Sequence, residues 1–401
     1  SPAWPPWVSR SIPPNTMIAM PESPSHESSF SLANARHLVS DLFVPRPWIY
    51  WTDFLVSAAI GNTAIGMFFI AVREPTRFLP SLPLAVRIAA GLAAYIVGSL
   101  AFYRISLFIH ELAHMRSGAM PVFRVAWNLL CGIPFLIPSF VYASHIGHHR
   151  RNLYGTELDG EYLAFGLESP WSMVKHMAMN FVLPILTVLR FLVVGPISWF
   201  VPPLRRRVLR HASSMVIDFR YRRPETTSRR ERLSVFVQEL LCFAWLLSIA
   251  VVPPVFLGHW PIPFIVVGYS VSVFILTLNA IRSLGSHRFH FDKHHEVGFV
   301  EQLLDSVNVH RSPLISELWG PIGTRYHALH HLFPGMPYHS MPEAHRRLTD
   351  GLPADSAYHR TEEPSLTAAL LDLWRRSVAA GRGARTRSAA EEVGNQAVVA
   401  G

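Results

Sequence analysis

Three short histidine clusters restrict the folds open to this chain, because their side chains form a common site only if all three meet. The clusters span His110–His114, His145–His149 and His327–His331 and hold eight of the 21 histidines. The spacing is i, i+4 in the first cluster and i, i+3, i+4 in the others, which places the imidazoles of each on one helix face. Converging neutral imidazoles are typical of a transition-metal site. Eight ligands are too many for one ion, so the sequence predicts two metals.

Long apolar runs predict an integral membrane protein. Of the 401 residues, 50% are hydrophobic, and the mean hydropathy is +0.24. Several runs reach the ~20 residues that a helix needs to cross a bilayer. The runs cover residues 52–72, 84–108, 121–142, 178–201, 234–256 and 261–282.

The histidine clusters limit how these runs cross the membrane, because all three must lie on the same side. Runs 52–72 and 84–108 form one predicted hairpin, which ends at the first cluster, and runs 234–256 and 261–282 form a second. Run 121–142 lies between the first and second clusters, so it must return to the side on which it starts. We therefore expect a re-entrant or interfacial element there.

Run 178–201 is predicted to be interfacial for a different reason. A full crossing would place segment 205–232, which holds ten arginines, outside the cell, against the tendency of basic loops to stay cytoplasmic. Both interfacial runs also carry residues that interrupt a straight helix. These residues are Pro121, Gly132, Pro134 and Pro138 for the first run and Pro184, Pro196 and Pro202 for the second.

The predicted fold is all-α, with four transmembrane helices in two hairpins, interfacial or re-entrant helices, and a cytoplasmic helical cap at 283–380 that carries the third cluster. We divide the chain into a proline-rich cytoplasmic arm at 1–45 that is poorly ordered or lies on the surface, a membrane domain at 46–355, and a C-terminal helix with a disordered tail at 356–401. The active site and both termini are expected to face the cytoplasm.

The basic residues are nearly all arginine, since lysine occurs only at Lys175 and Lys293. This usage suggests a bacterial genome rich in G and C, and hence the bacterial inner membrane. The formal net charge of +9 does not indicate nucleic acid, because much of it lies in segment 205–232. That segment is interpreted as a cytoplasmic loop, with a docking surface for anionic lipid or an acidic partner as the alternative.

The clusters and their flanks resemble the three histidine boxes of the membrane fatty acid desaturase and hydroxylase superfamily. Residues Tyr326–Pro334, with the sequence YHALHHLFP, are similar to that family's third box, and Pro337–His339 and His345–Arg346 follow as its tail. Residues Arg151–Tyr162 resemble the sequence after the second box. The resemblance covers about residues 50–355. Three boxes in order, separated by apolar runs, are a specific signal, whereas one box alone would be weak.

The resemblance implies two non-haem iron ions, dioxygen as co-substrate, and hydrogen abstraction from an unactivated C–H bond of a lipid chain. It also implies a ninth histidine near the end of the fourth span, and His287 fits that place. Some acyl-CoA members carry an asparagine four residues before this histidine, where this chain has Ser283, with Asn279 one turn earlier. The implied iron ligands are His110, His114, His145, His148, His149, His287, His327, His330 and His331.

Carboxylates commonly orient metal-bound imidazoles, and several lie close to the boxes in sequence. Asp305 and Glu317 are candidates for this role, and the alternative for each is an ordinary surface or helix-capping residue. The main supporting candidates are Glu111, Asp159, Glu161, Asn279 and Ser283.

Further histidines lie close to the proposed ligands. The polar stretch 290–295 carries three and is interpreted as a solvated loop, with an accessory metal contact as the alternative. His310, His339 and His345 lie near the third box, and His339 and His345 could support the ligands there.

Two alternative functions compete with this interpretation. His110–His114 also matches the H-E-x-x-H motif of zinc proteases, in which the glutamate acts as general base, with Leu158–Gly160 as the further ligand motif. That alternative leaves two boxes unexplained. Within the resembling superfamily, the same centre hydroxylates or ketolates lipids. The box spacings and Leu332–Pro334 favour desaturation, so the sequence predicts a desaturase acting on a lipid-linked or thioester-linked fatty acyl chain.

The predicted reaction needs electrons from a separate protein. No flavin or haem domain is visible, and Cys131 and Cys242, both in apolar runs, cannot form the cysteine cluster of an iron–sulfur centre. A small carrier such as ferredoxin is expected. Arg205, Arg206 and Arg207 are one candidate docking site for it.

Overall fold

The computed structural model describes residues 30–116, 118–226 and 228–399. In this described part the regular structure is helical, and pairing between extended segments is limited to three isolated β-bridges. The all-α prediction is confirmed.

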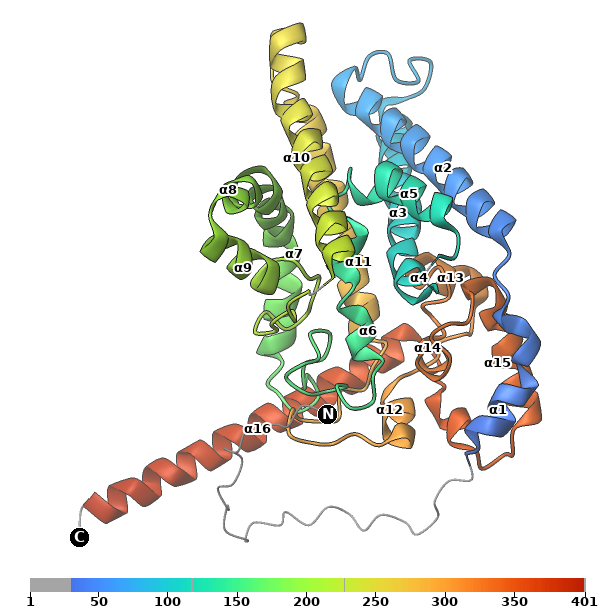
Figure 1. Cartoon of the computed structure of the whole chain (residues 1–401), viewed down its shortest axis with the longest axis vertical. Coiled ribbons are helices and arrows are strands. Elements are labelled where there is room, and N and C mark those ends of the chain that lie inside the picture. Colours follow the sequence, from blue (N-terminus) through green and yellow to red (C-terminus); the bar gives the residue numbers. More distant parts are fainter. Residues whose placement is uncertain (1–29, 117, 227, 400–401) are drawn as a thin grey trace.

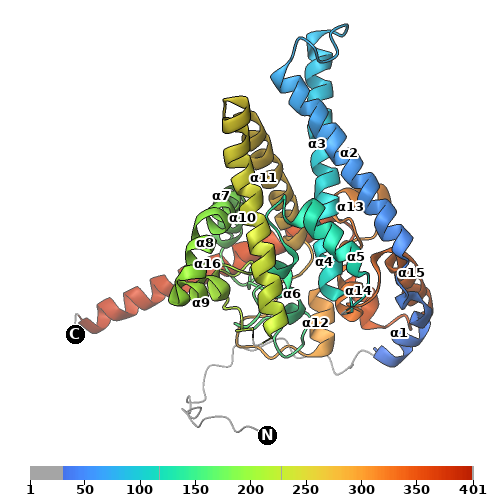
Figure 2. The same ribbon diagram turned by 45° about the horizontal axis from the view of Figure 1, so that its top comes forward.

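Two helical hairpins form the apolar part of the molecule. They consist of α2 (Pro47–Arg73) with α3 (Leu84–Ser106), and α10 (Arg229–Leu257) with α11 (Ile262–Leu284). Both project from the same side of the molecule, away from the cap (Figures 1 and 2). All four helices are long and apolar enough to cross a membrane. Only 6% of the most apolar stretch of α10 is buried, which is typical of a helix that contacts lipid on most sides.

Glycines let α2 and α3 pack closely. A Cβ atom at Gly61 would stand 2.5 Å from the Phe102 ring, and one at Gly98 would stand 2.7 Å from the Ile65 side chain. Small residues at such crossings allow close backbone approach in lipid, where no hydrophobic force drives helices together. Phe102 belongs to an aromatic core at the foot of this hairpin, with Tyr50, Phe54, Tyr103, Phe108, Phe123 and Trp127.

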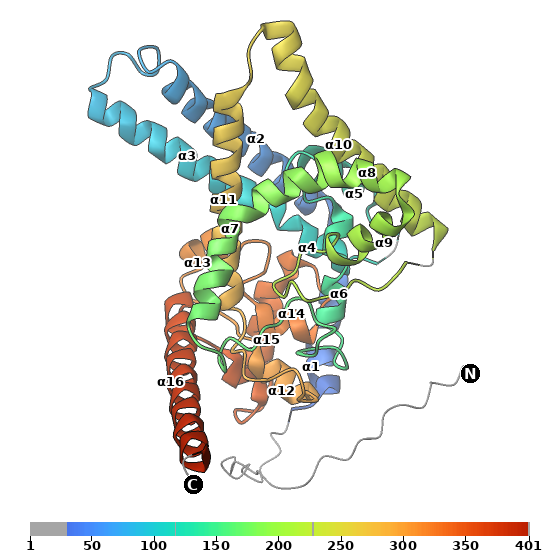
Figure 3. The same cartoon turned by 90° about the vertical axis from the view of Figure 1, so that its left-hand side faces the viewer.

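A fifth segment, Trp171–Phe200, also has the length and apolarity of a membrane span. It consists of α7 (Trp171–Leu189), the π-helical turn η4 (Arg190–Val194) and α8 (Gly195–Phe200), and is followed by α9 (Pro202–His211). Figure 3 shows the chain turning sideways along α7 on its way to α8. Pro184 lies inside α7 and η4 follows it, and proline and π turns are both known causes of such bends. Among the described residues, five segments are candidate spans by length and composition, whereas the sequence placed 178–201 at the interface. The predicted four crossings stay a prediction.

Run 121–142 is divided into short pieces, as its prolines indicated. The pieces are α5 (Pro121–Trp127), the π turn η2 (Asn128–Gly132) and the 3-10 turn η3 (Ser139–Tyr142). The Trp127 indole donates to the Ile105 carbonyl at 2.8 Å, which ties α5 to the end of α3.

The cap consists of short helices between α11 and the C-terminal helix. Its elements are α12 (Phe299–Asp305), α13 (Pro313–Trp319), α14 (His327–Leu332), η5 (Tyr338–Ser340), α15 (Met341–Gly351) and η6 (Ala357–Thr361).

The structure describes part of each end of the chain. In the N-terminal arm, α1 (Leu32–Leu38) packs on α15, and Arg347 pairs with Asp41 at 2.6 Å. Residues 1–29 of that arm lie outside the described residues. At the other end, α16 (Leu366–Val399) runs through the predicted disordered tail and extends away from the rest of the molecule (Figure 1). Its alanine, arginine and glutamate residues are strong helix formers.

Candidate metal centre

Short helices position the predicted metal ligands. The first box lies on α4 (Phe108–His114), which follows α3 after a break at Leu107, and the second begins on α6 (His145–His148). The third box lies on α14, and His287 follows the end of α11. The structure brings all nine predicted ligands together in two groups. The first group is His110, His114, His145, His149 and His330, and the second is His148, His287, His327 and His331.

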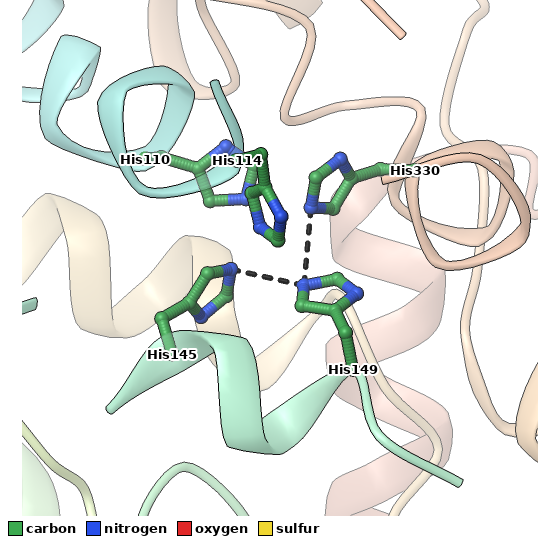
Figure 4. A group of neighbouring side chains, drawn as sticks. All are labelled: His110, His114, His145, His149 and His330. Atoms are coloured by element: carbon green, nitrogen blue, oxygen red, sulfur yellow. Dashed lines mark hydrogen bonds between the residues drawn. The ribbon is translucent and has the colours of Figure 1, made fainter. Parts of the chain in front are cut away.

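In the first group, five imidazoles converge from three helices (Figure 4). His149 Nε2 lies 3.0 Å from His145 Nε2 and 3.1 Å from His330 Nε2. His110 and His114 approach from α4, and the His110 ring centre is 4.2 Å from that of His330. Within the group, one ligand atom from each residue lies within 4.8 Å of those of the others.

The second group is fully buried and equally compact. His287 Nε2 lies 3.1 Å from His148 Nε2 and 2.8 Å from His327 Nε2. His331 Nε2 lies 3.1 Å from His327 Nε2. Because neighbouring residues of the second and third boxes divide between the two groups, both sites use α14 and the segment that begins with α6.

This geometry fits metal binding. Two ligands about 2.1 Å from one ion and at right angles stand about 3 Å apart, which matches the Nε2 separations in both groups. His110 Nε2 and His114 Nε2 are buried without a hydrogen-bond partner among the described residues, which is unfavourable for a polar atom unless an ion binds it. Burial and neighbouring imidazoles hold the pKa of His145, His149 and His330 well below its usual value. These rings are therefore neutral, as metal ligation requires.

Two of the predicted carboxylates contact ligand histidines. His148 Nδ1 lies 2.8 Å from Asp159 Oδ2, and His145 Nδ1 lies 2.8 Å from Glu161 Oε2. Asp159 also accepts the N–H groups of Gly155 and Glu161, at 3.0 and 2.9 Å. Burial opposes charge on His148, but Asp159, together with Glu161 and Asp305, outweighs burial and raises the pKa of His148. Burial raises the pKa of Glu161 to about 8. Such contacts fix the ring orientation and direct Nε2 toward an ion.

Tyr154 supports the second group, although sequence reasoning did not single it out. Its hydroxyl lies 3.0 Å from His287 Nδ1 and donates to Asp305 Oδ2 at 2.6 Å. Asp305 lies 3.7 Å from the same Nδ1, so it acts on His287 mainly through Tyr154. The available signal was the place of Tyr154 in segment Arg151–Tyr162, which resembles the family sequence after the second box.

Glu111 contacts other residues than the histidines beside it in sequence. Its carboxylate accepts from the Tyr50 hydroxyl at 2.5 Å and from the Tyr338 N–H at 3.4 Å. Glu111 therefore joins α4 to α2 and η5, and it is not placed as the general base of a zinc protease. Glu317 likewise pairs with two arginines.

Asn279 and Ser283 bind a buried arginine rather than a histidine. Asn279 Oδ1 accepts from Arg282 Nε and Nη2 at 3.2 and 3.1 Å, and Ser283 Oγ accepts from Nη2 at 3.0 Å. Arg282 is 6% exposed. Together with burial and neighbouring imidazoles, its charge lowers the pKa of His287 and His327. An ionisable residue in an apolar run was the signal that could have identified it.

Comparison with known proteins agrees with this site. The family model described as "Fatty acid desaturase" matches residues 86–362, which include all nine histidines. The chain is 38% identical over 343 residues to a protein named "Ceramide hydroxylase" from Caulobacter vibrioides (strain NA1000 / CB15N), and the match covers 85% of this chain and 92% of that protein. No solved structure matches significantly. The chain belongs to the membrane fatty acid desaturase family.

Proposed function

We propose that this protein is a di-iron hydroxylase that adds one oxygen atom to a C–H bond of a ceramide or a similar lipid. The observation that carries the proposal is the 38% identity to a ceramide hydroxylase across 92% of that protein. Membership of the family makes the chain an oxidoreductase acting on lipids. Desaturation, which the box spacings favoured, becomes the alternative, because a hydroxylase relative of this similarity outweighs the spacings.

The proposed reaction consumes one dioxygen, two electrons and two protons. One oxygen atom enters the C–H bond to give an alcohol, and the other leaves as water. Desaturation would use the same inputs, remove two hydrogens from adjacent carbons and release two waters. An alkyl C–H bond offers no acidic proton for a side chain to take, so a cofactor must supply the difficult step. Bound iron would supply the activation of dioxygen.

The residues of the chain would bind and orient the two ions. The group that contains His110 and His330 would hold one iron, and the group that contains His148 and His327 would hold the other. Asp159, Glu161 and Tyr154 contact the Nδ1 atoms of three of these histidines and so fix their rings. Most of these histidines are buried, which would limit the access of bulk water to the reacting bond.

Electrons would come from a separate acidic carrier of the ferredoxin type, which docks on α9. Arg206, Arg207 and Arg210 line a cavity of about 380 Å³ there, and complementary charge would speed the encounter. Arg205 was predicted to share this role, but it forms an ion pair with the buried Glu239 at 2.6 Å. The docking surface is therefore assigned without it.

The proposed orientation places the histidines and the cap in the bacterial cytoplasm. The five apolar helices make the chain a membrane protein. The arginines of 205–232 favour the cytoplasmic side, and α9 lies toward the cap end of α10 rather than at its tip (Figure 2).

The proposal is tested by mass spectrometry of lipids from a bacterium that makes ceramide and expresses this chain. We expect a ceramide heavier by one oxygen atom, absent when the host expresses His330→Ala. A ceramide or acyl lipid lighter by two hydrogens would instead establish desaturation. If ceramide is unchanged in a host that also expresses a ferredoxin and its reductase, the substrate proposal is wrong.

A further inference from the structure

A third cluster of metal-binding side chains lies in the cap, outside the two histidine groups. His310 follows α12 in sequence, His345 lies on α15, and Glu362 follows η6. One ligand atom from each lies within 4.8 Å of the other two, and the two ring centres are 4.4 Å apart. Three segments distant in sequence therefore bring two imidazoles and a carboxylate to one point.

These three side chains face one another but do not satisfy one another's hydrogen-bonding groups. His345 Nε2 lies 3.7 Å from Glu362 Oε1, which is too long for a hydrogen bond. His310 Nδ1 is buried and has no hydrogen-bond partner among the described residues. Ligands that share one ion about 2 Å away stand about 3 to 4 Å apart. The separations fit an ion between the side chains better than direct bonds.

The surroundings of His345 favour ligation through Nε2. Its Nδ1 lies 2.8 Å from the Tyr358 hydroxyl, and metal-bound histidines almost always bond their second ring nitrogen to a polar neighbour. The Tyr358 contact occupies Nδ1 and leaves Nε2, which faces Glu362, as the ligand atom.

We propose that His310, His345 and Glu362 bind a zinc ion that has a structural role in the cap. Two histidines and one glutamate form an established zinc donor set, and water can fill the fourth tetrahedral position. His310 and Glu362 are partly exposed, which leaves room for that water. The site is separate from the two histidine groups, and the inference does not depend on the proposed hydroxylase activity.

The zinc would clamp the segments that surround α14. Asn308, two residues before His310, bonds through its N–H to the Thr361 carbonyl at 2.8 Å and accepts from the Glu363 N–H at 2.9 Å. Its side-chain oxygen accepts from the Leu329 N–H of α14 at 3.1 Å. An ion that joins this segment to α15 and η6 would hold the backbone that supports the third box.

The test is the metal content of the purified, iron-loaded, full-length protein, measured by plasma mass spectrometry. Wild type is compared with His345→Asn and Glu362→Gln, and with His359→Asn as a neighbouring control. We expect about one zinc per chain in wild type and in the control, and loss of that zinc with iron retained in the two variants. A zinc chelator should lower the Tm of wild type and leave the Tm of Glu362→Gln unchanged.

Equal zinc in wild type and Glu362→Gln would overturn the proposal, as would wild-type protein that takes up no zinc at micromolar concentration. If His345→Asn fails to fold, Glu362→Gln decides the question, because its partly exposed side chain can change to an amide of the same shape.

Discussion

His148 Nδ1 lies 2.8 Å from Asp159 Oδ2, and this contact joins the second histidine group to the loop that follows the second box. Asp159 also accepts two backbone N–H groups of its own loop, from Gly155 and Glu161. The carboxylate is therefore fixed before any ion binds, and it fixes the His148 ring in turn.

Asp159→Asn should weaken metal binding at the second group. The amide can rotate to keep one hydrogen bond but loses the negative charge, and changes to such partners lower metal affinity about 10- to 100-fold. Iron release to a chelator measures the effect, with the exposed Glu157→Gln as control. Release rates equal to wild type would show that Asp159 does not orient His148.

Tyr154→Phe should affect His287 in the same way. The change removes the hydroxyl between His287 Nδ1 and Asp305 Oδ2. The buried Asp305 carboxylate then has one hydrogen-bond donor fewer, which should lower the stability of the fold by about 1–3 kcal/mol. We expect lower iron occupancy and turnover, measured on the same preparation. Tyr95→Phe, in the α2–α3 hairpin, is the control and should behave as wild type.

The pKa of Glu161 predicts a pH effect on the metal-free protein. Burial raises that pKa from 4.5 to about 8, so between these values the folded state holds a proton that the unfolded state has lost. This contribution to the free energy of unfolding falls as pH rises from 4.5 to 8. The buried histidines with lowered pKa values contribute with the opposite sign, and His148, whose pKa is raised, contributes with the same sign. The difference between wild type and Glu161→Gln therefore isolates Glu161.

Thermal unfolding of both proteins across this range gives that difference. The Tm of metal-free wild type should fall relative to that of Glu161→Gln as pH rises toward 8. Bound metal should reduce this fall, because the charge of the metal favours the ionised carboxylate. A Tm difference between the two proteins that stays constant across this pH range would contradict the raised pKa of Glu161.

Arg190, Arg205 and Glu239 form a buried charge cluster between η4, α9 and α10. Glu239 is 1% exposed, bonds to Arg190, and pairs with Arg205 at 2.6 Å. Glu239→Ala should destabilise the protein by about 3–5 kcal/mol, because it leaves charged groups buried without their partner. Unfolding in detergent measures the change, and Glu225→Ala on the nearby surface should have little effect.

Reversing charge on α9 tests the electron-donor surface. Arg206→Glu with Arg207→Glu should weaken donor association and reduce its dependence on salt, since rim charges act mainly on the association rate. The control is a double variant on α16, Arg375→Glu with Arg382→Glu, which changes the net charge by the same amount. Unchanged donor kinetics in the first variant would exclude this surface.

Helical spacing places the eight histidines of the three boxes on one face of each box, whereas His287 was indicated only by the family resemblance. Asp159 and Glu161 could also be predicted, since they lie in the loop after the second box. Glu111 shows the limit of such reasoning: it lies between two ligands in sequence, yet one helical turn directs successive side chains to different faces. The position of Arg282 beside the histidines depends on how α11 packs against the cap, and the spacing of residues in the sequence does not reveal that packing.

Two segments carry mixed sequence signals. Run 178–201 has the apolarity of a span and the interruptions of an interfacial segment, so composition alone does not decide its course. The tail 380–401 is rich in alanine, glycine and arginine, and the sequence predicted disorder there. In the structure α16 continues to Val399, and alanine and arginine are strong helix formers.

The most direct test of the central claim is oxidation of ceramide by the purified, iron-loaded protein with a ferredoxin, its reductase and isotopically labelled dioxygen. The account predicts a hydroxylated ceramide that carries one labelled oxygen atom, and no product from His330→Ala with its reduced iron content. An unlabelled product, a product that has only lost two hydrogens, or undiminished turnover in His330→Ala would contradict it.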